Sequence, residues 1–143
     1  MKLWTRMALL LAFVPLIASA QFKDMDTAKS SLTLGFGSGD ASAIVAGIGE
    51  GDQVMLQFEG LMDKSGFFGR DQAAYLLGGL FSKVHPTGFE LLNLRKFSTE
   101  NQYHITASWT INNGGKVEVR DLYITLHSKN DRWSIVSVRA GSK

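Results

Sequence analysis

The polar pair best placed for chemistry in this sequence is Arg120 and Asp121, because the alternation of the surrounding strand pattern changes phase between them. Val117 and Val119 occupy one phase, whereas the apolar residues that follow Asp121 occupy the other. Such a change predicts a β-bulge, and a bulge can turn a side chain toward a site. An Asp held there with a raised pKa can act as a general base. The alternative is an exposed charge pair with little effect.

Histidine is the second residue type that could carry acid–base chemistry. The three histidines are His85, His104 and His127, and no two have the spacing of metal ligands on one helix or loop, so no metal site is predicted. His104 lies on the polar face of a predicted strand, but the sequence identifies no partner that would orient its ring. There is no cysteine nucleophile, Ser-His-Asp order or recognisable carboxylate pair. The residues therefore make no positive case for an enzyme.

Two glycine-rich stretches, at 35–40 and 47–52, superficially resemble a phosphate-binding loop. A dinucleotide site requires such a loop between a strand and the start of a helix. The first stretch follows a predicted helix and the second precedes a predicted strand. Both are interpreted as helix ends and turns, and no cofactor is predicted.

Residues 1–20 have the composition of an export signal. Lys2 and Arg6 precede an apolar run, and Ala18-Ser19-Ala20 is a small-residue cleavage site. The run is shorter than the about 20 apolar residues that a membrane-spanning helix needs. We expect cleavage near Ala20, delivery to the periplasm or outside the cell, no membrane span in the mature form, and one domain over 21–143.

The charge balance of the expected mature chain bears on its partners. Of the 15 Lys and Arg residues, Lys2 and Arg6 lie in the signal, which leaves 13 against 13 Asp and Glu. A neutral chain lacks the basic surface that attracts nucleic acid. The basic and aromatic stretch 95–97 is therefore not interpreted as a nucleic-acid surface, and no such partner is predicted.

Periodicity predicts the order helix, helix, strand, helix and four strands. The helices are expected from Phe22 to Phe36, from Asp40 to Ile48 and after Gly69 as far as Pro86, and the strands over 53–59, 88–97, 102–111, 116–127 and 132–140. The third helix contains Gly78-Gly79, each of which costs about 1 kcal/mol relative to alanine. We expect another backbone to approach closely there.

This order is similar to that of the nuclear-transport-factor-2-like cone fold. The resemblance lies in Ser38-Gly39-Asp40-Ala41 between the first two helices and in Gly69-Arg70-Asp71-Gln72-Ala73 at the start of the third. The stretch 81–86, followed by Gly88-Phe89, resembles more narrowly the small exported bacterial family called domain of unknown function 4783. The expected fold class is α+β, cystatin-like, with three helices packed on a bent antiparallel sheet.

The resemblance implies a cone-shaped sheet around a pocket, frequently a dimer through the sheet, and a superfamily of both enzymes and non-catalytic binders. We expect a non-catalytic exported domain that binds a small apolar or amphipathic molecule, or an envelope protein, through its pocket or sheet face. The candidate ligand-binding residues are Arg120, Asp121, Trp109 and Tyr103.

Two alternatives remain open at the level of sequence. One is a small hydrolase, isomerase or dehydratase that uses Asp121 or His104. The other is a structural envelope protein that forms a homodimer through the strand face carrying Thr106, Ser108 and Thr110.

Overall fold

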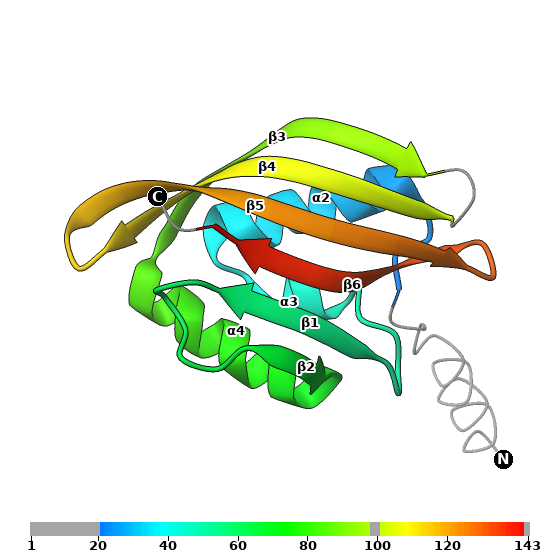
Figure 1. Cartoon of the computed structure of the whole chain (residues 1–143), viewed down its shortest axis with the longest axis horizontal. Coiled ribbons are helices and arrows are strands. Elements are labelled where there is room, and N and C mark those ends of the chain that lie inside the picture. Colours follow the sequence, from blue (N-terminus) through cyan, green and yellow to red (C-terminus); the bar gives the residue numbers. More distant parts are fainter. Residues whose placement is uncertain (1–20, 98–100, 142–143) are drawn as a thin grey trace, which may run out of the picture.

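One bent sheet carries three helices on one of its faces, as the computed structural model shows for residues 21–97 and 101–141, which it describes (Figure 1). The elements are α2 (Met25–Ser38), α3 (Ala41–Val45), β1 (Gln53–Phe58), β2 (Gly66–Gly69), α4 (Arg70–Val84), β3 (Pro86–Phe97), β4 (Gln102–Asn113), β5 (Lys116–Lys129) and β6 (Arg132–Ala140). The expected export signal at 1–20 and the predicted turn residues Thr99 and Glu100 lie outside the described residues.

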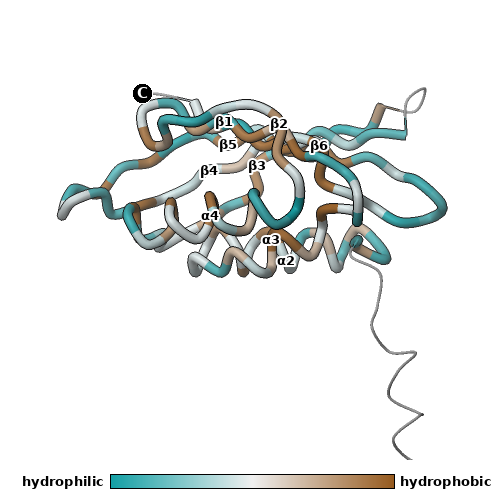
Figure 2. Tube along the Cα trace, turned by 90° about the horizontal axis from the view of Figure 1, so that it is seen from below, coloured by the Kyte–Doolittle hydropathy of each residue, from teal (hydrophilic) through white to brown (hydrophobic). Residues whose placement is uncertain are grey.

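The strand order across the sheet is β2-β1-β6-β5-β4-β3. Neighbouring strands are antiparallel except β1 and β6, which are parallel. Figure 2 shows the strands in one layer and α2, α3 and α4 in a second layer beneath it. The α+β class and the arrangement of helices on one face of a bent sheet are as predicted.

The helix ends follow from local chemistry. The Asp24 carboxylate accepts a hydrogen bond from the Thr27 N–H at 2.7 Å, which satisfies one free donor at the start of α2. α2 ends at Gly39, whose φ of 75° suits glycine. α4 begins after Gly69 without a side-chain cap and ends just before Pro86. The limits of α4 agree with the sequence pattern. The predicted start of α2 at Phe22 is wrong, because Phe22 exchanges main-chain hydrogen bonds with Trp133 and the helix begins only at Met25.

The short strand β2 was not predicted. It pairs with β1, with Phe68 opposite Val54. Only one of its two aromatic rings is buried, since Phe67 is 68% exposed and Phe68 is 8% exposed. Four residues with glycine at both ends are too few to show alternation, so only the pairing reveals this strand.

The predicted bulge at Arg120-Asp121 is wrong. β4 and β5 pair without a register shift along their whole paired length. The inner face of β5 continues from its apolar residues through Arg120 to Glu118, while Val117 and Val119 lie exposed on the outer face. Polar residues at inward positions, and valines at outward ones, therefore produced the apparent change of phase.

Register shifts occur elsewhere in the sheet. β3 has two against β4, between Pro86 and Gly88 and between Leu91 and Asn93. A third separates Thr125 from Leu126 where β5 pairs with β6. Bulges bend a strand and increase its twist, which accounts for the curvature of β3 over α2.

Aromatic rings occupy the space between sheet and helices. Trp109 on β4 is fully buried, with its ring centroid 5.7 Å from that of Phe36, 5.8 Å from that of Phe58 and 6.2 Å from that of Phe81. Its Nε1–H donates to the Phe36 carbonyl at 2.8 Å. These residues come from β4, α2, β1 and α4, so one cluster joins the sheet to two helices.

Candidate functional site

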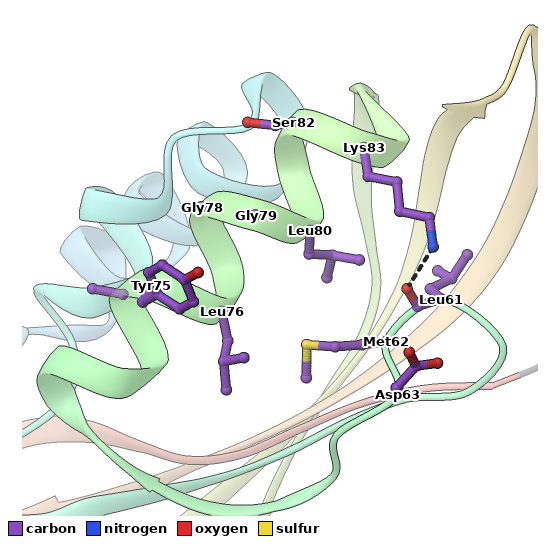
Figure 3. Close-up of a pocket in the computed structure, with 11 residues that line it drawn as sticks. Leu61, Met62, Asp63, Tyr75, Leu76, Gly78, Gly79, Leu80, Ser82 and Lys83 are labelled. Carbon is purple, nitrogen blue, oxygen red and sulfur yellow. Dashed lines mark hydrogen bonds between the residues drawn. The ribbon is translucent and has the colours of Figure 1, made fainter.

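A groove of about 580 Å³ lies between α4 and the loop that joins β1 to β2. Figure 3 shows Leu76 and Leu80 on the helix and Met62 on the loop pointing into the space between them. Leu61 adds a further apolar side chain, and Asp63 lies on the same loop. The groove is open to solvent and mainly apolar, as expected of a surface that binds an apolar group.

The two glycines of α4 belong to this groove. The expectation that another backbone approaches them closely is wrong, because a Cβ at Gly78 or Gly79 would meet no other atom within 4 Å. Both residues line the groove. Their missing side chains deepen it, which gives the unfavourable helix glycines a role that the sequence alone did not indicate.

Two cationic side chains hold the loop wall of the groove. The Lys83 Nζ donates to the Leu61 carbonyl at 3.4 Å, as the dashed line in Figure 3 marks. The Arg120 Nη1 donates to the Glu59 carbonyl at 2.8 Å. The loop is thereby tied to α4 on one side and to β5 on the other.

Arg120 is the most buried charged residue among those described, with 8% of its surface exposed. It donates a second, longer bond from Nη1 to the Gly141 carbonyl at 3.4 Å, and Nη2 lies 3.5 Å from a Glu118 carboxylate oxygen. Its Nε is buried and has no hydrogen-bond partner among the described residues. Arg120 thus joins the ends of β1 and β6 to β5, a structural arrangement more than a catalytic one.

Glu118 gives a prediction about acid stability. The Asn113 side chain donates to its carboxylate at 3.1 Å, and this bond, aided by the Arg120 charge, holds the pKa of Glu118 below its usual 4.5. A pKa lowered by folding stabilises the protein above the unfolded value, and this stability is lost as the pH falls through the folded value. Urea unfolding of Glu118→Gln should therefore depend less on pH below about pH 4.5 than unfolding of the wild type. Equal dependence would mean that the interaction contributes nothing.

The sequence candidates lie on opposite faces of the sheet. Trp109 and Arg120 are paired neighbours on the inner face, the first fully buried and the second nearly so. Asp121 lies exposed on the outer face, and so does His104. The structure therefore separates the two acid–base candidates from the groove and the interior.

The two remaining candidates, His104 and Tyr103, each pack against a neighbouring aromatic ring. The His104 ring packs edge to face on Phe97 with centroids 4.5 Å apart, and its Nε2 is 3.4 Å from the Gln102 side-chain oxygen. Tyr103 faces inward near the start of β4, half-buried against Trp133 at 4.7 Å. Tyr103 lies near the start of β4, away from Trp109 on the same strand and from Arg120, which is paired with Trp109 on β5.

Sequence reasoning singled out Gly78-Gly79 but missed the groove that they line. Its other wall is a loop, and loops have no periodicity to reveal which side chains turn inward. The signal available was Leu61-Met62, an apolar pair set between Gly60 and Asp63 in an otherwise polar turn.

Neither a metal centre nor a spanning helix is found within the described ranges. Residues 21–97 and 101–141 contain no group of three or more His, Cys, Asp or Glu side chains placed to hold a metal ion. No helix in that part of the chain is long and apolar enough to cross a membrane.

The sheet order and the helices on one face give the chain a nuclear-transport-factor-2-like fold. The chain belongs to the family described as Domain of unknown function (DUF4783), whose model matches residues 29–140. No curated protein matches the sequence. The predicted membership of this family is thereby confirmed.

Solved structures agree on the fold. A DUF4783 family protein from Bacteroides ovatus is 18% identical, with a TM-score of 0.65 over 78% of this chain and 91% of that one. An NTF-2-like protein of unknown function from Shewanella oneidensis is 16% identical, with a TM-score of 0.62 over 82% and 98%. A hypothetical protein with a ketosteroid isomerase-like fold from Catenulispora acidiphila, in complex with trimethylamine, is 8% identical, with a TM-score of 0.61 over 80% and 84%. At these identities the likeness concerns the fold alone.

Proposed function

We propose that this chain is an exported, non-catalytic binding domain that holds a small apolar or amphipathic molecule in the groove between α4 and the 59–65 loop. The observation that carries the proposal is an apolar groove deepened by two helix glycines whose missing side chains leave open space. The composition of residues 1–20 supports export.

The groove is a better candidate than the interior of the cone. Inside the cone, the rings of Phe36, Phe58, Phe81 and Trp109 pack against one another and are almost wholly buried. A ligand there would have to displace core side chains, at a cost of several kcal/mol. The groove needs no such displacement, because it already opens to solvent, with Leu76 and Met62 partly exposed on its two walls.

The lining indicates the kind of ligand. Leu76, Leu80 and Met62 supply apolar contact, and the flexible thioether of Met62 can adapt to different shapes. Lys83 and Asp63 place one charge of each sign at the loop side. This combination suits a molecule with an apolar body and a polar end.

The positions of Asp121 and His104 support a non-catalytic function. A general base must lie within hydrogen-bond reach of the proton that it removes, and neither residue lines the groove. If the protein is instead an enzyme that uses these side chains, Asp121→Asn and His104→Ala would abolish turnover while the fold stayed intact.

An amphipathic fluorescent dye, 1-anilinonaphthalene-8-sulfonate, tests the groove directly. We expect saturable binding to the wild-type protein, and about tenfold weaker binding to Leu76→Asp, because a carboxylate in the apolar wall costs the bound state at least about 1.4 kcal/mol. The matched control is Leu34→Asp, since Leu34 is a 50% exposed leucine on α2, outside the groove. Equal dye affinity in the two variants would contradict the proposal.

A further inference from the structure

The outward face of α4 presents a large aromatic side chain beside a hollow. Tyr75 is 82% exposed, the highest value among the exposed large hydrophobic residues of the described chain. Gly79 follows it one helical turn later and leaves open space above the helix. Figure 3 shows the Tyr75 ring standing out from the helix on the turn before the two glycines. A ring that projects from one molecule can fit a hollow of this kind on a second molecule.

The sequence of α4 is self-complementary about its centre. Tyr75 precedes Leu77 by two residues and Gly79 follows it by two, while Asp71 precedes Leu77 by six and Lys83 follows it by six. Two antiparallel helices related by a two-fold axis at Leu77 therefore bring Tyr75 of each copy to the level of Gly79 of the other. The same pairing brings Asp71 in the first turn of each helix to the level of Lys83 in the last turn of the other. Both side chains are exposed, and the 3.4 Å bond from Lys83 Nζ to the Leu61 carbonyl leaves the ammonium two further donors.

We propose that a second copy of this chain docks on α4 in this antiparallel arrangement, and that its Tyr75 covers Gly79 and closes the open side of the groove. A two-fold interface requires that if residue i meets residue j, residue j also meets residue i, and the two pairs on α4 satisfy this condition. The pairing goes beyond the proposed function and does not require the ligand, so each can fail without the other.

The Tyr75–Gly79 pairs and the Asp71–Lys83 pairs contribute to the proposed interface in different ways. Tyrosine buries a large area with few rotatable bonds, and the missing side chain at Gly79 lets the second helix approach to the short end of the usual 8–10 Å axial separation. Exposed ion pairs contribute little affinity. The Asp71 and Lys83 pairs therefore fix the antiparallel direction, because parallel helices would place like charges together.

A charge exchange tests the arrangement by sedimentation velocity over a concentration series. We expect a wild-type dimer, at least tenfold weaker dimers for Asp71→Lys and for Lys83→Asp, and recovery in the double variant D71K/K83D. Each single reversal costs more than the loss of an ion pair, because it places like charges together at both symmetry-related pairs. The control is Asp26→Lys, which makes the same charge change in the first turn of α2. A monomeric wild type, or a double variant no better than the single variants, would overturn the proposal.

Two further variants separate this interface from the sheet face and from the groove. At protein concentrations where the wild type is monomeric, Gly79→Leu should raise the melting temperature by about 3 °C, because leucine is the better helix residue and its Cβ meets no other atom. At higher concentrations it should abolish the dimer. Asp71 does not line the groove, so Asp71→Lys should lose the dimer and keep dye binding. If Ser108→Lys on the outer sheet face dissociates the dimer and Gly79→Leu does not, the interface is the sheet and our assignment is wrong.

Discussion

Replacing Trp109 with alanine should lower the free energy of unfolding by about 3–5 kcal/mol, the range for a buried tryptophan truncated to alanine. The Trp109 indole is fully buried, packs edge to face against three other rings and donates its only N–H to the Phe36 carbonyl. Truncation removes these contacts and leaves a cavity that the surrounding helices cannot fill. Urea unfolding followed by far-UV circular dichroism measures the loss.

Two companion variants identify the source of that loss. Trp109→Phe keeps an aromatic ring but removes the hydrogen bond to Phe36, so it should cost less than the alanine variant. Trp133→Ala truncates a tryptophan that is only half-buried, and should also cost less. If Trp133→Ala proves as damaging as Trp109→Ala, the ring cluster is not the centre of the core.

The interior of this domain is filled with side chains, so knowing the fold does not reveal where a binding site lies. The resemblance implied a pocket inside the cone, and the same sheet and helices are present here, but aromatic side chains occupy that space. The groove instead lies outside the core, where α4 meets the loop after β1. The fold class therefore does not decide where a ligand binds.

The regular elements could be predicted because their residues alternate or recur with a period. Val54, Leu56 and Phe58 are all buried on one side of β1, as their spacing indicates. Along β4, the residues from Ile105 to Ile111 alternate in the same way. β2 could not be predicted, because its four residues are defined by pairing with β1 and not by a pattern of their own.

The site was predicted less well, because its determinants are tertiary contacts. Arg120 was singled out, but a pattern that counts only apolar residues cannot distinguish an inward-facing arginine from a bulge. Its main-chain partner in Glu59 is 61 residues away in sequence, and that in Gly141 is 21 residues away. For Gly78-Gly79, the sequence showed that two residues unfavourable to a helix lie within one. It did not show whether the space beside them is filled or open.

Replacing Arg120 with methionine is expected to have the second large effect. Methionine retains much of the side-chain volume but donates no hydrogen bond, so the Glu59 and Gly141 carbonyls lose their partner and Glu118 loses its nearby cation. Leaving a buried carbonyl without its hydrogen-bond donor lowers the free energy of unfolding by about 1–3 kcal/mol. We expect a loss of stability in that range, measured by urea unfolding. The dye should also bind more weakly, because Arg120 holds the loop wall at Glu59.

Arg139→Met is the matched control, since Arg139 is exposed on the outer face, where it lies over the Tyr123 ring. It should change stability by less than about 1 kcal/mol and leave dye binding unchanged. A double-mutant cycle of Arg120→Met with Glu118→Gln then isolates the charge pair, because the second substitution should cost less once the arginine is absent. If Arg120→Met is as stable as the wild type, the unpartnered Nε offsets the three interactions of the guanidinium, and Arg120 does not hold the loop in place.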